Sequence, residues 1–90
     1  MTTQKLPLGQ LLITSTAKRK LHLPDALKAL IRHEKCDFGE VAESDKEANR
    51  EALETGDRIL SAYLDRNGIR FWIITEGDRS STTILMPEDY

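Results

Sequence analysis

Residues 58–76 read RILSAYLDRNGIRFWIITE, in which an Asn-Gly pair separates two runs rich in β-branched and aromatic residues. An Asn-Gly pair in this setting is the strongest short-range signal for a β-hairpin, and it favours a two-residue type I′ turn. Such a turn places both Asn67 and Gly68 at positive φ and sets Leu64 opposite Phe71. The stretch therefore predicts two antiparallel strands in a defined register.

The predicted register divides the hairpin side chains between two faces. The face expected to pack on the core carries Leu60, Ala62, Leu64, Phe71 and Ile73. The opposite face carries Ile59, Ser61, Tyr63, Asp65, Arg70, Trp72, Ile74 and Glu76. Across the strands of that second face, Asp65 pairs with Arg70 and Tyr63 with Trp72. This face is too apolar for open solvent and too polar for a sealed core, so we expect it to be partly covered or to bind a ligand.

The strands on either side of this hairpin follow from similar signals. A second hairpin is expected downstream, with Asp78-Arg79 at its tip and a last strand over residues 81–86, before Pro87 ends the ladder. Residues 8–14 are short and apolar and predict a first strand. Residues 15–21 suit one helical turn.

Two longer helices are expected between the first strand and the hairpin. In residues 23–35 Pro24 suits the first helical position. The expected apolar stripe of this helix comprises Leu23, Ala26, Leu27, Leu30 and Ile31. The next helix is expected to start at Asp37, with Glu40 completing a capping box, and to end at Gly56. A strand, two helices and three antiparallel strands predict an α+β fold with the helices on one face of the sheet. We expect a single domain over residues 1–90.

The composition argues against several classes of protein. The 90 residues carry a net charge of −2, which gives no general basic footprint for nucleic acid. One cysteine and two histidines offer no metal-ligand spacing, so we expect neither a metal nor another cofactor. No apolar run is long enough to span a membrane, and residues 1–10 lack the apolar segment typical of a secretory signal, so we expect neither feature. Cys36 has no partner for an internal disulfide, which is typical of a cytoplasmic chain.

Polar residues interrupt this scaffold at several places. Asp45 and Asn49 lie one turn apart inside the expected apolar stripe of the later helix, so both need partners. We expect Arg79 to fold back and pair with Asp45, with Asn49 completing the network. His33 ends the earlier helix, where a cation interacts favourably with the helix C-terminus. Alternatively, its ordinary pKa suits a general acid or base.

Two long segments carry a recognisable pattern. They read RHEKCDFGEVAESDKEANREAL, residues 32–53, and FWIITEGDRSSTTILMPEDY, residues 71–90. The positions that match are Arg32, His33, Asp37, Gly39, Asp45, Asn49, Ser61, Tyr63, Trp72, Thr75, Glu76, Asp78, Arg79, Ser80, Thr82, Pro87 and Tyr90. In this pattern the chain resembles a family of small bacterial proteins labelled plasmid-related, or as a subunit of a type I restriction endonuclease. Cys36 stands where the family has Gly, and Phe38 where it has Trp. The resemblance covers nearly the whole chain and implies a plasmid or phage context, but no particular reaction.

The expected order of elements also resembles that of the RelE-like toxins and the wider barnase–RelE group of small ribonucleases. Two hypotheses about function follow. The first is a non-enzymatic module that binds a protein partner through the mixed face of the hairpin. The second is a small metal-independent ribonuclease, for which RNA is the substrate.

Each hypothesis has its own candidate residues. For the ribonuclease, His33 is the acid or base and Arg79 stabilises the phosphorane, because its guanidinium matches phosphate oxygens. Ser80 or Thr82 orients the phosphate, so the catalytic candidates are His33, Arg79 and Thr82. The binding candidates are Asp45, Asn49, Ser61, Tyr63, Trp72, Glu76, Asp78 and Ser80. The simplest alternative for residues 76–79 is a solvated turn.

Overall fold

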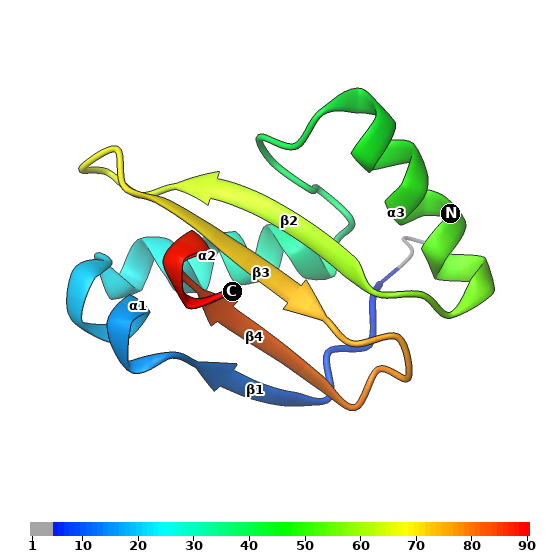
Figure 1. The fold of residues 1–90 in the computed structure, drawn as a ribbon, viewed down its shortest axis with the longest axis horizontal. Coiled ribbons are helices and arrows are strands. Elements are labelled where there is room, and N and C mark those ends of the chain that lie inside the picture. Colours follow the sequence, from blue (N-terminus) through cyan, green and yellow to red (C-terminus); the bar gives the residue numbers. More distant parts are fainter. Residues whose placement is uncertain (1–4) are drawn as a thin grey trace.

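The computed structural model describes residues 5–90, which form one four-stranded sheet and three α-helices (Figure 1). In chain order the elements are β1 (Gln10–Ile13), α1 (Ser15–Lys20), α2 (Leu23–Glu34), α3 (Glu43–Thr55), β2 (Ile59–Leu64), β3 (Arg70–Thr75), β4 (Ser81–Leu85) and the 3₁₀ turn η1 (Pro87–Asp89). The fold is therefore of the predicted α+β class.

The strand order in the sheet is β1-β4-β3-β2 (Figure 1). Strands β2, β3 and β4 form the two antiparallel hairpins that the sequence predicts. β1 pairs with β4 in the parallel direction, with Leu11 beside Thr82 and Ile13 beside Ile84. The predicted architecture is thus right in part: the three later strands are antiparallel, but the complete sheet is mixed because β1 is parallel to β4.

The β2–β3 hairpin is shifted by one residue from the predicted register. Tyr63 lies opposite Phe71, and Leu64 opposite Arg70. The Asp65 carbonyl accepts a hydrogen bond from Gly68 N–H, so the loop spans residues 66–68 in place of a two-residue type I′ turn. Only the glycine of the Asn-Gly pair has positive φ, at 76°.

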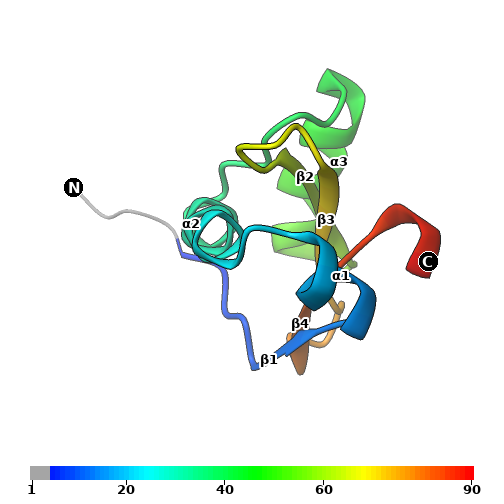
Figure 2. The ribbon, with the colours of Figure 1, turned by 90° about the vertical axis from the view of Figure 1, so that its left-hand side faces the viewer.

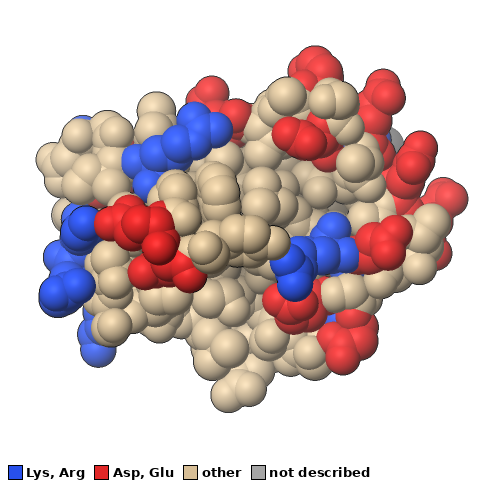
Figure 3. All heavy atoms as spheres, in the orientation of Figure 1, with Lys and Arg blue, Asp and Glu red and all other residues tan. Residues whose placement is uncertain are grey.

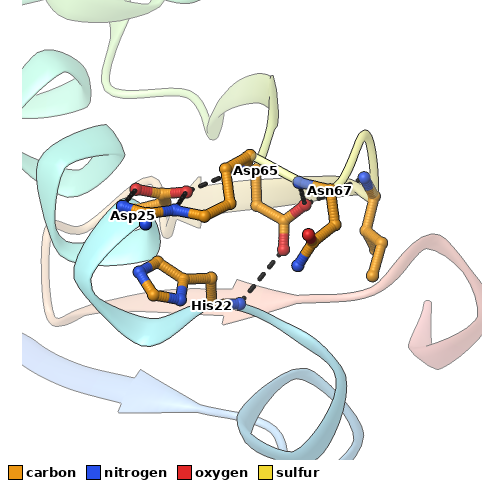
Figure 4. A network of polar contacts seen from close by, with 6 residues as sticks. His22, Asp25, Asp65 and Asn67 are labelled. Carbon is orange, nitrogen blue, oxygen red and sulfur yellow. Dashed lines mark hydrogen bonds and ion pairs between the residues drawn. The ribbon is translucent and has the colours of Figure 1, made fainter.

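The Asp65 side chain explains why the longer loop forms. Its carboxylate is buried and accepts hydrogen bonds from the main-chain N–H groups of Asn67, Ile69 and His22 (Figure 4). Burial alone would raise the pKa of this carboxyl. The three N–H donors together lower it by more, so its pKa lies below the ordinary value. These charge-assisted bonds favour the observed loop over the type I′ turn. The predicted ion pair with Arg70 is wrong.

The register shift exchanges the two faces of β2, because neighbouring residues of a strand face opposite sides of a sheet. Ser61 and Tyr63 are buried on the same face as Phe71, whereas Leu64 is 53% exposed. Phe71 is fully buried, as predicted. The predicted contact between Tyr63 and Trp72 is wrong: the Tyr63 ring packs on Phe71, with centroids 5.8 Å apart, and Trp72 contacts the ring of the C-terminal tyrosine.

Helix α2 packs on one face of the sheet, and η1 lies on the opposite side (Figure 2). The side chains that α2 buries are Ala26, Ala29, Leu30 and His33. Three members of the predicted stripe, Leu23, Leu27 and Ile31, are exposed instead. The helix is rotated so that small alanines approach the sheet and one row of large aliphatic side chains faces solvent.

Helix α3 begins at Glu43 and lies beside β2 at the sheet edge (Figure 1). The predicted start at Asp37 is wrong, because the preceding chain forms a bridge from Gly39 to Ala62. A side chain at position 39 would clash there, since a Cβ would lie 2.1 Å from the Ala62 carbonyl oxygen. The helix ends at Gly56, as predicted.

Candidate functional site

The edge of the sheet formed by β2 is covered by other parts of the chain. The Asn49 side chain donates to the Leu60 carbonyl at 2.8 Å and accepts from the Leu60 N–H at 3.2 Å. The Ala62 N–H donates to Phe38, and the Ala62 carbonyl accepts from Glu40. Asn49 therefore ties α3 to the sheet as the sequence led us to expect, although its partner is β2 and not the last hairpin.

The edge formed by β1 is free. The N–H groups of Gln10 and Thr14 donate to main-chain carbonyls of the β4 region, at Ser80 and Ile84. Because main-chain groups alternate in direction along a strand, Leu11 and Ile13 direct theirs away from β4. Within residues 5–90 no strand pairs with this side of β1. The strand has no charged residue to discourage pairing, and exposed edges of this kind recruit other chains.

An apolar groove of about 240 Å³ lies beside this free edge, between β1 and α2. It is lined by Leu11, Leu12, Ile13, Lys18, Leu23, Ala26, Leu27, Leu30 and Ile84. Leu11 is 55% and Leu27 59% exposed. We refer to the free edge and this groove together as the β1–α2 surface.

Charge is unevenly distributed around the molecule. In Figure 3 basic side chains gather at the left edge, next to a smaller acidic cluster. Helix α1 contributes Lys18, Arg19 and Lys20, and Lys20 pairs with Glu88 at 2.6 Å. Acidic side chains gather at the opposite end, near α3 and the β3–β4 turn (Figure 3). The β1–α2 surface therefore has a basic rim at the α1 end of β1.

A buried polar network links α2 to three strands and the N-terminal segment. His33 Nδ1 lies 2.6 Å from Ser61 Oγ, and His33 Nε2 lies 2.8 Å from Thr75 Oγ1. Thr75 Oγ1 lies 2.7 Å from Thr82 Oγ1, which donates to the Leu8 carbonyl at 2.7 Å. All four side chains are essentially inaccessible to solvent.

The terminal carbonyl fixes the direction of the hydrogen bonds that run from His33 Nε2 through Thr75 and Thr82 to Leu8. Since each hydroxyl has one proton and Thr82 donates to Leu8, Thr75 must donate to Thr82. Thr75 then accepts from His33 Nε2–H, so this nitrogen is protonated. In the neutral ring Nδ1 is therefore unprotonated and accepts from Ser61.

Burial favours the neutral form of His33. Desolvation lowers its pKa from 6.5 to about 4, because the imidazolium would lose its hydration. The ring is 0% exposed and both nitrogens are bonded within the protein. The cationic helix-end role considered for His33 is therefore wrong. The geometry gives the ring and Thr82 no contact with an external substrate.

Arg79 folds back onto α3, but its partners differ from those predicted. The guanidinium donates to the carbonyls of Ala52 at 2.7 Å, Asp57 at 2.8 Å and Glu76 at 3.2 Å. The contacts with Ala52 and Asp57 satisfy carbonyl groups at and just beyond the C-terminal end of α3, where a cation is favourable. Asp45 is exposed at the other end of that helix, so the predicted Asp45–Arg79 pair is wrong.

The polar residues of the β3–β4 turn form local contacts. Glu76 pairs with Arg58 at 3.4 Å. The Asp78 carboxylate accepts hydrogen bonds from Ser80, which lower its pKa, and both residues are exposed. The simplest expectation for this stretch, a solvated turn, describes Asp78 and Ser80 well.

The aromatic candidates are separated by the sheet. Tyr63 is buried, its hydroxyl donates to the Asp37 carbonyl, and burial raises its pKa to about 12. Trp72 lies on the other face, half-buried, with its ring centroid 5.7 Å from that of Tyr90. The mixed face predicted as a binding surface therefore does not exist as one surface.

Asp37 is held by Arg32, whose guanidinium donates to both of its carboxylate oxygens, at 2.8 and 3.3 Å. These bonds lower the pKa of Asp37. The carboxylate also accepts from the Gly39 N–H, so it supports the loop before α3 and does not cap the helix.

The sequence reasoning missed the β1–α2 surface. One signal for it was present: α2 carries large aliphatic residues around more of its circumference than one buried face needs, with Leu23, Leu27 and Ile31 on one side and Leu30 on another. An excess of this kind indicates a second apolar contact.

Comparisons of the chain with protein-family models, curated proteins and solved structures gave no match. In the part of the chain that the structure describes, no cluster of three or more His, Cys, Asp or Glu side chains is arranged to hold a metal ion. Among the helices of residues 5–90, none has the length and apolar character needed to cross a membrane.

Proposed function

We propose that the chain is a protein-binding module of a bacterial plasmid or phage, and that its partner binds at the β1–α2 surface. The observation that carries this proposal is the free, uncharged edge of β1 beside an apolar groove. The fold covers the other edge of the same sheet completely at Leu60 and Ala62. The plasmid or phage context rests on the sequence resemblance.

The binding mode that suits this surface is strand addition. An extended segment laid beside β1 would pair with the outward main-chain groups of Leu11 and Ile13, and such pairing supplies affinity in strand-addition complexes. Side chains of the added strand that point toward α2 would enter the groove next to Leu27. Lys18 on the rim favours a partner that carries acidic residues beside apolar ones.

The buried network holds together the elements that form this surface. Thr82 holds the Leu8 carbonyl, two residues before β1 begins, and His33 joins the same network from α2. The strand and the helix that flank the groove are therefore fixed relative to each other by buried hydrogen bonds. A preformed groove of this kind loses less conformational entropy on binding.

The ribonuclease hypothesis has less geometric support. Its acid or base, His33, is enclosed, and the Arg79 guanidinium is occupied by three main-chain carbonyls. Within residues 5–90, none of the predicted catalytic residues lines an open space that could hold a phosphate. We therefore favour binding over catalysis.

Photo-crosslinking in bacterial cells that carry the gene tests the proposed function. A photoreactive residue replaces Leu27 in the groove, and in a separate variant it replaces Leu64, which is similarly exposed on the β2 strand. We expect a specific polypeptide, identified by mass spectrometry, to be cross-linked from position 27 and not from position 64. Equal yields from both positions, or recovery of RNA in place of protein, would refute the proposal.

A further inference from the structure

We propose that the partner at the β1–α2 surface is a second copy of this chain, bound through antiparallel pairing of the two β1 strands. This inference rests on the proposed function of that surface. Pairing of this kind joins the two sheets into one continuous eight-stranded sheet, since each sheet has four strands with β1 at one end. The two-fold axis lies perpendicular to the sheet, as in other isologous dimers formed by strand edges.

The main-chain geometry of β1 is self-complementary. Leu11 and Ile13 direct their N–H and C=O groups outward, and Leu12 lies between them with its groups directed toward β4. With the axis at Leu12, Leu11 of each copy faces Ile13 of the other in a hydrogen-bonded pair. Leu12 then faces Leu12 of the other copy in a non-hydrogen-bonded pair. All outward groups of the strand find partners in this single register.

The side chains that β1 exposes fit the same register. Leu11 and Ile13 lie beside Thr82 and Ile84, which are buried on the α2 face of the sheet. Because the axis is perpendicular to the sheet, the grooves of both copies lie on the same side and adjoin at the new strand pair. Leu11 of one copy then packs beside Ile13 of the other, and the exposed Leu27 side chains border the shared groove.

Charge favours the antiparallel direction. Helix α1, with Lys18 and Arg19, follows the end of β1. The β3–β4 turn adjoins its start, because Gln10 N–H donates to the Ser80 carbonyl, and the exposed carboxylate of Asp78 belongs to that turn. Antiparallel pairing brings Lys18 and Arg19 of each copy toward the Asp78 turn of the other. A parallel arrangement would bring like charges together.

Cysteine cross-linking tests this register directly. The free thiol Cys36 is first replaced (Cys36→Ser), and Leu12→Cys or Leu11→Cys is then introduced at an exposed position. In the proposed dimer the Cα atoms of the two residues 12 are about 4.5 Å apart, within disulfide range. The two residues 11 are diagonal neighbours at about 7–8 Å, too far for a disulfide.

We expect mild oxidation with oxidised glutathione to convert the Leu12→Cys variant to a disulfide-linked dimer at least tenfold faster than the Leu11→Cys variant. Equal rates, or no dimer from either variant, would overturn the proposed register. Far-UV circular dichroism of both variants before oxidation confirms that the comparison is between folded proteins.

Light scattering after size-exclusion chromatography separates the two proposals. The wild-type chain should elute with twice the mass of one chain at high concentration. Leu12→Lys, which places like charges opposite each other, should be monomeric, and Leu64→Lys on the other edge should remain dimeric. A monomeric wild type that still cross-links a different protein from position 27 would refute self-pairing and leave the proposed function standing. If position 27 captures no protein, both proposals fail.

Discussion

Protonation of His33 should control how the stability of this protein depends on pH. The folded state holds the ring neutral, with a pKa lowered from 6.5 to about 4, whereas the unfolded chain exposes it at its ordinary value. The unfolded state therefore binds more protons between these two pH values, so stability must fall as the pH falls. The contribution is complete above pH 6.5 and is lost progressively down to about pH 4.

The size of the effect follows from the gap between the two pKa values. Multiplied by about 1.36 kcal/mol per pH unit, the gap gives about 3 kcal/mol. Carboxyls with lowered pKa, such as Asp65 and Asp37, also destabilise the fold in acid, but their contribution is lost below about pH 4. Between pH 4 and 6.5 the change in stability with pH therefore reports the protonation of His33.

Urea unfolding at several pH values between 7.5 and 4 measures this dependence. The wild type should lose about 3 kcal/mol of unfolding free energy across the window. His33→Gln, which cannot titrate there, should lose much less, and His22→Asn serves as the matched control that keeps the wild-type slope. If His33→Gln is too unstable to analyse, the imidazole NMR signals of the wild type report the His33 pKa directly. Equal slopes in all three proteins, or a His33 pKa near 6.5, would refute the buried neutral ring.

Substitutions at four further positions test the packing and the loops by urea unfolding. Phe71→Ala should cost about 3–5 kcal/mol, because the ring is completely buried, and a cost below about 1 kcal/mol would contradict its central position. Asp65→Ala should cost about 2 kcal/mol and Asp65→Asn less, since an amide oxygen still accepts from the loop N–H groups; the reverse order would show that the carboxylate does not hold the loop. Gly39→Ala should cost at least about 1 kcal/mol more than Gly68→Ala. Both glycines have positive φ, but only at position 39 would the added Cβ clash with a carbonyl oxygen, that of Ala62. Equal costs would rule out this close approach.

Local signals in the sequence predicted most of the elements, whereas long-range contacts decided the details. The Asn67-Gly68 pair located the hairpin, but the Asp65 carboxylate also binds His22, 43 residues earlier in the chain, and this contact favours the longer loop. Turn statistics contain no such contact. The one-residue shift that resulted reversed the faces of β2, which also removed the predicted binding face.

The predicted site residues illustrate the same limit. Asn49 was rightly expected to need a partner and Arg79 to fold back, but both bind main-chain groups, which a pattern of side chains does not reveal. His33 stood out as a titratable residue, and only the fold shows that Ser61 and Thr75 enclose it. The free edge of β1 depends on strand order, which the sequence did not determine.

A dilution series followed by amide NMR tests the proposed role of the β1 edge most directly. If two copies pair through β1, the Leu11 and Ile13 amide signals should shift with concentration and their hydrogen exchange should slow as the dimer forms. The Leu60 and Ala62 amides, on the covered edge, should stay unchanged. Association that shifts the Leu60 and Ala62 signals while leaving those of Leu11 and Ile13 constant would contradict the assignment of β1 as the binding edge.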